Sequence, residues 1–497
     1  MHSMLSIVVV IPQHNPRAWQ AQIIHRLEAD NCDVAVLHEP SAAPWPTVVN
    51  TLLGLERRLF RRFDEGLASP VTSIPARSVT RPPTLRLDLV GSAPPSDTPT
   101  LTVRFDRANA DFTIARTVAL GELPILEAVM DGRTIVGRAA PMIDRREATS
   151  LGVEDVLARA VTLILSVVRA FAEGRLEDMG TVSSASDTSG EGFLAAYLSR
   201  ALPRLGREAF RRARFRHAHW RVGYRFIDGP GVAETGRLGA GWTVLPDAGD
   251  RFYADPFAIH WQGRPFVFVE DYVHVAGKAV ISVVPFTDDR RPLPPRVVLE
   301  EPHHLSYPQV FERDGALWML PEASASSRLT LYRAAEFPDT WQPVATLLEG
   351  EISDATLLVQ GGSLWLFATR RDSYGSTSDT MVVFEAATLL GPWREHAANP
   401  ILIDRRRARP GGAFIRSREG RLLLPVQDGT LGYGGGLGLS DLLRLDATTV
   451  HLSDPRPILT DGDWPYPQIH TLNRSGSLEV IDGIAAVPRR SESSSAS

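Results

Sequence analysis

Carboxylates stand at matching positions in the C-terminal half of this 497-residue sequence. Asp255 and Asp354 each open a strand-like segment, whereas Glu270 and Glu322 each close one. Two carboxyl groups facing one site are the arrangement most often used for cleavage or transfer at an anomeric carbon. We therefore assign these four as candidate catalytic residues. Asp255 would be the base or nucleophile, Asp354 would orient sugar hydroxyls or tune its partner, and Glu322 or Glu270 would be the acid.

The segments around these carboxylates repeat at a constant spacing. In four of them a Gly lies seven residues after the first position and a polar residue lies fourteen after it; the first positions are Pro256, Pro308, Ala355 and Ala413. A looser fifth copy begins at His470. The copies lie about fifty residues apart, a period typical of β-propeller blades. The sequence therefore predicts an all-β, five-bladed propeller, with a β-sandwich of hairpins as the alternative.

The two ends of each hairpin return to the same end of a blade, so the five units should present one polar ring around a channel. Aromatic side chains gather near these positions, and flat rings beside carboxylates suit the faces of sugars. Ordinary turn and packing roles are the alternative for each residue. The residues expected to bind substrate are Tyr253, Asp271, Ser306, Tyr307, Arg370, Gln427, Asp428, Tyr433, Trp464, His470 and Asn473.

No cofactor is expected, and no residue is assigned to a metal, because no spacing here matches a dedicated calcium loop. The run Arg405 to Arg409 precedes the fourth unit and would suit an anionic substrate group, although such runs are more often solvated loops. The segment Gly434-Gly435-Gly436 lacks the strand and helix that a phosphate loop requires.

The N-terminal half has a different pattern. The runs SIVVVI and DVAVLHE are strand-like, and Pro16 to Asn31 and Thr47 to Phe63 have helical periodicity. This alternation predicts a Rossmann-like α/β domain over residues 1–185. A linker and helix follow at 186–218, the propeller at 219–485 and a disordered tail at 486–497. HWRVGYRF and GWTVLP, which precede the first blade, should complete the last sheet and leave no free edge.

Composition restricts the class of protein. With 43% hydrophobic and 22% charged residues and a net charge of −5, the chain is an ordinary folded protein with no global basic face for nucleic acid. No apolar run approaches the roughly 20 residues of a membrane helix. Cys32 is the only cysteine, so no intrachain disulfide can form. We interpret the protein as cytoplasmic.

The repeated segments also carry a resemblance. YADPFAIHWQGRPFVFVED, SYPQVFERDGALWMLPEAS, SDATLLVQGGSLWLFATRRD, GGAFIRSREGRLLLPVQD and IHTLN resemble the N-terminal propeller domain of plant glucosamine inositolphosphorylceramide transferases. They also resemble bacterial two-domain proteins in which this propeller follows a formyltransferase-like α/β region. The first half would then be a degenerate formyltransferase relative, because His14-Asn15 does not reproduce that family's catalytic pattern.

More distantly, the second half is similar to the five-bladed propellers of family 43 and family 32 glycoside hydrolases. In those families one Asp opens the first blade and another opens a later blade, and Asp255 and Asp354 match these positions. The hydrolases take their acid, a Glu, from a blade after the second Asp. Here the fourth unit offers Gly412, Gln427 and Asp428 instead, so the resemblance implies a glycan context and leaves the reaction open.

Three functions follow, in order of preference. The first is glycosyl transfer or cleavage in polysaccharide or glycolipid biosynthesis, on a carbohydrate or glycolipid substrate that includes anionic and nucleotide sugars as candidates. The second is a non-catalytic glycan-binding propeller that scaffolds a separate glycosyltransferase partner. The third is a formyl or acyl transferase centred on the N-terminal domain, for which the sequence offers no folate or thioester motif.

Overall fold

The chain folds into two compact units, as a computed structural model of it reveals. One comprises Met1–Glu208 with Asp372–Ser376, and the other comprises Ala209–Arg371 with Thr377–Ser497. Most of the expected disordered tail lies outside the described residues. The structure describes residues 5–41, 44–60, 66–78, 80–92, 94, 96–183, 192–216, 218–372 and 374–488.

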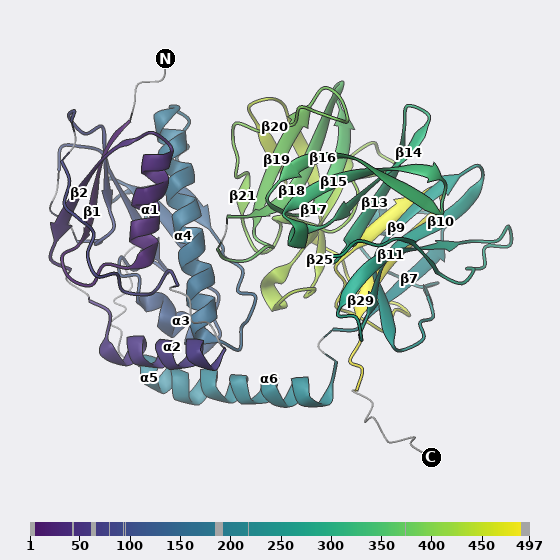
Figure 1. Cartoon of the computed structure of the whole chain (residues 1–497), viewed down its shortest axis with the longest axis horizontal. Coiled ribbons are helices and arrows are strands. Elements are labelled where there is room, and N and C mark those ends of the chain that lie inside the picture. Colours follow the sequence, from purple (N-terminus) through teal and green to yellow (C-terminus); the bar gives the residue numbers. More distant parts are fainter. Residues whose placement is uncertain are drawn as a thin grey trace. The chain divides into compact units, whose positions relative to one another are not determined.

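The first unit contains a mixed six-stranded sheet in the order β2-β1-β3-β4-β5-β6 (Figure 1). The pairs β1–β2, β1–β3 and β3–β4 are parallel, whereas β4–β5 and β5–β6 are antiparallel. The strands are β1 (Ser6–Pro12), β2 (Asp33–Glu39), β3 (Leu85–Asp88), β4 (Thr100–Phe105), β5 (Leu126–Met130) and β6 (Thr134–Ala139). The helices are α1 (Ala18–Ala29), α2 (Thr47–Leu59), α3 (Thr113–Leu120) and α4 (Thr149–Ala172).

Helix α4 is the most extensively buried helix of this unit. Fifteen of the 24 residues of α4 are buried, and the helix packs against α1, α2 and α3. The strands and helices predicted from SIVVVI, DVAVLHE and the two periodic segments are confirmed, because their apolar residues form the buried faces. Within the described part of the chain, no helix is both long enough and apolar enough to cross a membrane.

A nearly continuous helical rod follows the first sheet (Figure 1). It comprises α5 (Phe193–Ala196), a π-helical turn (Tyr197–Ala201) and α6 (Leu202–Arg214).

The second unit is a five-bladed β-propeller, as the repeat spacing predicts. Blades 1 and 2 contain β9 (Arg251–Trp261), β10 (Arg264–Val273), β11 (Lys278–Pro285), β12 (Arg296–Leu299), β13 (Ser306–Arg313), β14 (Ala316–Glu322), β15 (Arg328–Glu336) and β16 (Thr340–Glu349). Blade 3 contains β17 (Glu351–Gln360), β18 (Ser363–Arg371), β19 (Thr380–Ala386), β20 (Arg394–Glu395) and β21 (Leu402–Ile403). Blade 4 contains β22 (Arg409–Pro410), β23 (Ile415–Arg416), β24 (Leu422–Gln427), β25 (Leu437–Leu445), β26 (Val450–Leu452) and β27 (Arg456–Pro457).

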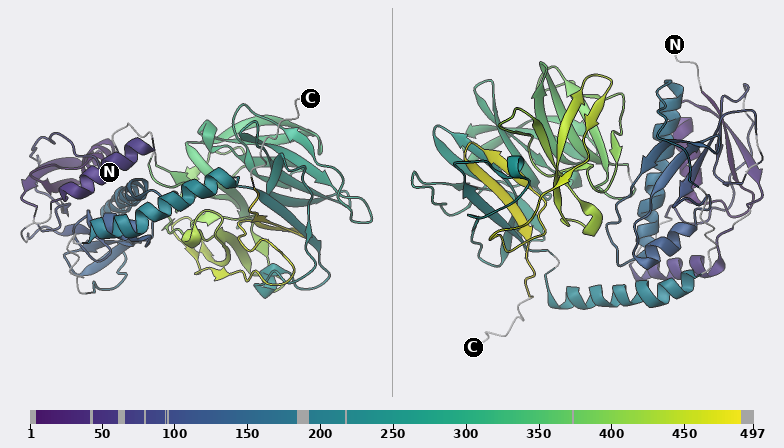
Figure 2. Two further views of the ribbon diagram at one scale, coloured as in Figure 1. Left: turned by 90° about the horizontal axis from the view of Figure 1, so that it is seen from below. Right: turned by 180° about the vertical axis from the view of Figure 1, so that it is seen from behind.

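Blade 5 joins the two ends of the propeller sequence. It pairs β28 (Leu472–Ser475) and β29 (Leu478–Ile484) with β7 (Trp220–Phe226) and β8 (Thr243–Val244), and a short helix, α7 (Val232–Thr235), lies between β7 and β8. Figure 2 shows the yellow C-terminal strands in one sheet with these much earlier strands. The expected completion of the last sheet by segments upstream of the first blade is confirmed. The ring therefore closes, and sheet edges remain at the outer strands of the blades, such as β12 and β16.

The spacing of seven and fourteen residues has a direct structural cause. The Gly of each unit occupies the left-handed turn of a hairpin, with φ of 79° at Gly263, 71° at Gly315 and 86° at Gly362. The residue fourteen positions along then pairs across the hairpin with the start of the first strand, as Glu322 does with Ser306. Apolar side chains between neighbouring blades complete the core.

Candidate active site

The first strands of the blades converge, and each bends where it approaches its neighbours. Asp255, Tyr307 and Asp354 occupy the same position in blades 1, 2 and 3, and all three have left-handed backbones with φ of 47°, 45° and 50°. The strand pairing shifts register beside each of them. Such a conformation costs a non-glycine residue about 1–3 kcal/mol, and functional sites are among the places where it recurs. Other left-handed residues of the chain, such as Asp314, lie in exposed turns. The bulges position these side chains in one buried cluster.

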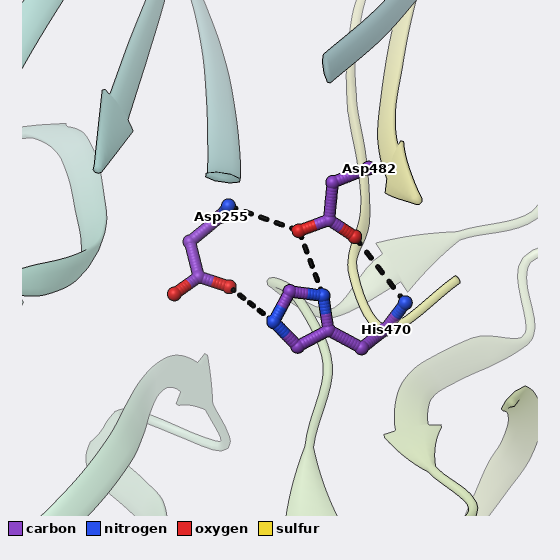
Figure 3. A group of neighbouring side chains, drawn as sticks. All are labelled: Asp255, His470 and Asp482. Carbon is purple, nitrogen blue, oxygen red and sulfur yellow. Dashed lines mark hydrogen bonds and ion pairs between the residues drawn. The ribbon is translucent and has the colours of Figure 1, made fainter. Parts of the chain in front are cut away.

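His470 lies between two carboxylates from different strands (Figure 3). Its Nε2 atom is 3.3 Å from Oδ1 of Asp255, and its Nδ1 atom is 2.7 Å from Oδ2 of Asp482. Asp482 also accepts hydrogen bonds from the backbone N–H groups of Asp255, His470 and Thr471, at 3.0, 3.2 and 2.9 Å. Trp220 stacks on the imidazole, with ring centroids 3.9 Å apart. This network closes blade 5 onto blade 1.

Asp354 is held by a buried cation. Arg409 donates from Nε and Nη2 to the two carboxylate oxygens of Asp354, at 2.6 and 3.1 Å. Gln427 adds a hydrogen bond of 2.7 Å from its amide nitrogen. The bidentate geometry fixes the orientation of Asp354 and balances its charge. Arg409, the last residue of the basic run seen in the sequence, thus pairs with the protein's own carboxylate.

Tyr307 connects the two Asp sites. Its backbone N–H faces Oδ2 of Asp255 at 3.3 Å, while its hydroxyl accepts a hydrogen bond from the N–H of Gly412 at 2.6 Å. The same hydroxyl lies 2.8 Å from Oγ1 of Thr356. Tyr307 is fully buried, so it acts as a strut between blades 1, 2, 3 and 4.

The two glutamates lie beside the Asp pair, Glu270 within β10 and Glu322 as the last residue of β14. Glu270 faces His304 at 3.4 Å. Glu322 accepts hydrogen bonds from the hydroxyl of Ser306 and, at 2.9 Å, from the backbone N–H of Ser324. Both are largely buried, with exposed fractions of 8% and 7%. The four candidate catalytic carboxylates therefore occupy one region of the propeller.

Burial and mutual repulsion shift the proton affinities of the cluster. Burial first, and then the negative charges of Asp354 and Asp482, raise the pKa of Asp255 to about 7 against the opposing effect of His470. Burial and the charges of Asp255 and Glu322 raise the pKa of Glu270 well above its usual range. Carboxyl groups that keep their protons near neutral pH can act as general acids.

The imidazole and its second carboxylate shift as an ion pair. Burial by itself would lower the pKa of His470, but Asp482 and Asp255 raise it. Burial would raise the pKa of Asp482, but the His470 charge and the surrounding hydrogen bonds lower it. The favoured state is therefore an imidazolium paired with the Asp482 carboxylate.

The ligand atoms of Asp255, His470 and Asp482 lie within 4.8 Å of one another, the one group of metal-ligating side chains found among the described residues. A nitrogen and two carboxylates could hold a divalent cation in principle. The same atoms already pair with one another, so a cation would have to replace these contacts.

Several predicted substrate-binding residues lie in this region, and others do not. Ser306, Tyr307, Gln427 and His470 contact the cluster directly. Tyr433 is half exposed, lies against His470 edge to face and has the Arg409 guanidinium 5.3 Å from its ring centre. Tyr433 is therefore an accessible aromatic ring next to the cluster.

The remaining predicted binding residues have contacts of another kind. Tyr253 and Trp464 pack in the apolar layers between blades, and Asp271 pairs with Arg251 and Ser282. The side chain of Asn473 bonds to the backbone of Ala413 and Pro256, Asp428 caps a short 3-10 turn, and Arg370 pairs with Glu395. The structure places none of these six in contact with the carboxylates.

Sequence reasoning missed three contributors to the cluster. Trp220 comes from a strand 250 residues before His470, His304 from a connecting segment, and Thr356 from the interior of β17. No local signal distinguishes these residues from core or loop positions. Only closure of the ring brings them to the site.

Comparison with known proteins confirms the resemblance seen in the sequence. Residues 244–450 match the family described as glucosamine inositolphosphorylceramide transferase 1, N-terminal. The proteins of that name from Oryza sativa subsp. japonica and Arabidopsis thaliana are 31% and 30% identical over 197 and 196 residues, which cover 39% and 38% of this chain. The matched region spans about a quarter of those relatives, 26% and 25%.

Solved structures of similar shape include glycoside hydrolases. One is the catalytic domain of a family 62 α-L-arabinofuranosidase from Coprinopsis cinerea, with a TM-score of 0.37 and 13% identity over 56% of this chain and 93% of that one. Another is the α-L-arabinanase of Cellvibrio cellulosa, with a TM-score of 0.32 and 17% identity over 40% of this chain and 77% of that one.

Proposed function

We propose that this protein is a carbohydrate-active enzyme of polysaccharide or glycolipid biosynthesis, acting by glycosyl transfer or cleavage at the carboxylate cluster of the propeller. The observation that carries the proposal is the left-handed backbone shared by Asp255, Tyr307 and Asp354 in three successive blades. Backbone strain that recurs at the equivalent position of three blades, around one cluster of carboxylates, supports a catalytic role for this cluster.

The proton affinities support distinct roles. Asp255, with a pKa near 7, would act as base or nucleophile once ionised. Glu270, whose pKa burial and the neighbouring carboxylates raise well above its usual range, would donate a proton to the leaving group. Asp354, fixed by Arg409, would position a sugar hydroxyl or stabilise developing positive charge.

The substrate class is proposed from the relatives. Their names contain glucosamine, an amino sugar, and inositolphosphorylceramide, a phosphosphingolipid. A glycosylated lipid, a polysaccharide precursor or the nucleotide sugar that donates to either is thus the substrate to test first.

The test compares two Asp→Asn variants with matched backbones. Asp255 and Asp314 are both left-handed, with φ of 47° and 51°, and Asn tolerates this conformation. Asp314 lies on an exposed hairpin turn, with 84% of its side chain accessible. Wild type and both variants would be screened by thermal shift and turnover against nucleotide sugars, simple glycosides and anionic oligosaccharides. We expect Asp255→Asn to abolish turnover while folding normally and Asp314→Asn to behave as wild type; equal turnover in all three would remove Asp255 from the mechanism.

A specific observation also favours a non-catalytic glycan-binding role, in which the propeller scaffolds a separate glycosyltransferase. The carboxylates of Asp354 and Asp482 are saturated by the protein's own donors, and both side chains are almost inaccessible. Under this alternative, oligosaccharide binding survives Asp255→Asn, whereas Tyr433→Ala weakens it because Tyr433 is half exposed.

For the first unit we propose a degenerate formyltransferase-like domain that binds an acceptor or partner, over residues 1–185, linked through 186–218 to a propeller domain over 219–485. A cavity of about 230 Å³ lies where β1, β3 and β4 end, lined in part by Arg17, Trp45, Asp88 and Asp111. Both carboxylate oxygens of Asp111 accept hydrogen bonds from tryptophan N–H groups, those of Trp19 and Trp45. Open α/β sheets commonly bind ligands at this edge. The test is a thermal-shift screen of candidate acceptor molecules against wild type and Asp88→Asn. An acceptor that raises the melting temperature of wild type but not that of Asp88→Asn would support the assignment.

A further inference from the structure

Helix α6 (Leu202–Arg214) has an apolar side of which no residue is buried among the described parts of the chain. None of its residues is buried. Leu202, Leu205, Ala209 and Ala213 recur every three or four residues and share one side of the helix, with Phe210 beside them. Leu202 and Phe210 are 49% and 62% exposed. The preceding turns, to Leu194 at 46% and Leu198 at 54%, extend this exposed surface.

The opposite side of α6 is strongly basic. Arg204, Arg207, Arg211 and Arg214 recur at helical spacing, and residues 192–216 contain seven arginines and one acidic residue, Glu208, in a chain whose net charge is −5. Arginine is preferred over lysine in the whole chain, in which Lys278 is the only lysine. This preference does not explain why positive charge concentrates on one side of one helix.

Contacts of Arg204 fix the orientation of the helix on the first unit. Its guanidinium donates hydrogen bonds to the carbonyl oxygens of Val118 and Ala119, at 3.0 and 3.3 Å, at the C-terminal end of α3. A cation at this helix terminus is favourable. Residues two apart on a helix point in nearly opposite directions, so Leu202 faces away from this contact. Arg204 is therefore anchored at the end of α3, and Leu202 is directed away from this contact.

We propose that α6 and the turns before it bind the surface of a membrane that carries anionic lipids. The apolar side would enter the boundary between headgroups and acyl chains, while the long side chains of Arg207 and Arg214 extend along the helix toward the headgroups. An amphipathic helix of low overall hydrophobicity with a basic face lies on a bilayer and does not cross it. The proposal concerns the connecting helix alone and does not depend on the carbohydrate function proposed for the propeller.

The size of the apolar side favours a membrane over a protein partner. The 22 residues from Phe193 to Arg214 make a helix about 33 Å long, and a stripe about 10 Å wide then presents about 330 Å². A stable protein interface buries about 800 Å² on each partner. Membrane partition has no such threshold, because each inserted side chain contributes separately and the arginines add electrostatic attraction.

The experiment is co-sedimentation of the full-length protein with phosphatidylcholine vesicles, prepared with and without phosphatidylglycerol, at low and high salt. We expect binding only to the anionic vesicles, weakened by salt. The double variant Leu202→Glu/Phe210→Glu should lower the partition coefficient about tenfold or more. Arg207→Gln/Arg214→Gln should reduce the preference for anionic vesicles. Val275→Glu, at a site 94% exposed in the propeller, is the matched control and should bind as wild type.

Each other outcome overturns the proposal. Absence of vesicle binding by wild type would do so directly. Binding that persists in Leu202→Glu/Phe210→Glu would place the contact on another surface. Sedimentation velocity, run in parallel, tests self-association. If wild type forms dimers and binds no vesicles, and Leu202→Glu/Phe210→Glu is monomeric, the apolar side of α6 is an interface between copies of the chain. Unchanged far-UV circular dichroism of the variant ensures that its folding is intact.

Discussion

The Nε2 atom of His470 lies 3.3 Å from Oδ1 of Asp255, although the two residues are 215 positions apart in the sequence. Asp255 belongs to the first blade and His470 to the segment that enters the last one. The contact therefore exists only when the propeller is closed. It links the integrity of the fold to the protonation of the residue proposed as base.

The first prediction concerns the pH dependence of turnover. Asp255 must be ionised to act as base, and Glu270 must be protonated to act as acid. Activity should therefore follow a bell-shaped profile, in which it rises as Asp255 loses its proton near pH 7 and falls as Glu270, whose pKa is also raised, loses its own. The measurement is kcat/KM against pH for wild type, with Asp314→Asn as control. A profile that is flat from acidic to alkaline pH would contradict these roles.

The second prediction concerns stability. The folded pKa of Asp255, about 7, exceeds its unfolded value near 3.8, so this group favours the folded state at low pH and the benefit is lost as pH rises through 7. The raised pKa of His470 acts in the same direction, because its stabilising charge disappears on the alkaline side. Urea unfolding should therefore give a lower free energy at pH 8.5 than at pH 6. Each unit of raised pKa corresponds to about 1.4 kcal/mol.

Asp255→Asn provides the control for this effect. An amide does not titrate, so the free energy of unfolding of this variant should fall much less between pH 6 and pH 8.5 than that of wild type. Asp314→Asn should show the same fall as wild type. An equal decline in all three proteins would assign the pH dependence to other groups.

The third prediction concerns the buried pair of Arg409 and Asp354. Arg409→Met should destabilise the propeller by about 3 kcal/mol or more, because it leaves a buried carboxylate without its cation. The double variant with Asp354→Asn should recover part of this loss. Arg444→Met, which removes an arginine 62% exposed from a surface pair, should change stability by less than about 1 kcal/mol. Equal effects of the two Arg→Met substitutions would argue against a desolvated pair.

The fourth prediction concerns Gly412, which stands where blades 1 to 3 have Asp255, Tyr307 and Asp354. A Cβ there would lie 2.0 Å from the carbonyl oxygen of Leu472, and φ is 144°. Gly412→Ala should therefore destabilise the fold by more than 2 kcal/mol, on the order of an overpacked core substitution.

Gly263→Ala separates collision from backbone strain. Gly263 also has a positive φ, 79°, but its Cβ would meet open space. This variant should lose only about 1 kcal/mol, the usual cost of a left-handed alanine. The measurement is thermal unfolding of wild type and both variants. Similar losses of stability in Gly412→Ala and Gly263→Ala would mean that Leu472 can move aside.

The fifth prediction concerns ring closure. Ile481 is fully buried in β29, opposite Gly223 of β7. Ile481→Ala should cost about 2–5 kcal/mol, because it opens a cavity in the blade that joins the two ends of the propeller. Leu431→Ala, at a residue 72% exposed, should stay within about 0.5 kcal/mol of wild type. A small effect at Ile481 would indicate that blade 5 contributes little to closure.

The sequence by itself determined the blade architecture. A Gly turn and a constant hairpin length are local requirements of backbone geometry, and they leave a fixed spacing that survives in Pro256, Gly263 and Glu270 and in their counterparts. The resemblance of residues 244–450 to a transferase propeller was visible for the same reason. The convergence of Asp255 and Asp354 followed from their equal positions within the repeat.

Only the tertiary structure decided which polar residues share the cluster. Trp464 and Tyr253 look like binding aromatics in the sequence, yet they pack between blades, while Trp220 and His304 contact cluster residues without any local signal. The partner of Arg409 could not be predicted from the sequence either, because a run of arginines does not indicate whether one of them binds a substrate or pairs with the buried Asp354. Spacing along a strand fixes which end of a blade a residue occupies. Its partners depend on the closure of five sheets into a ring, which brings together residues more than 200 positions apart.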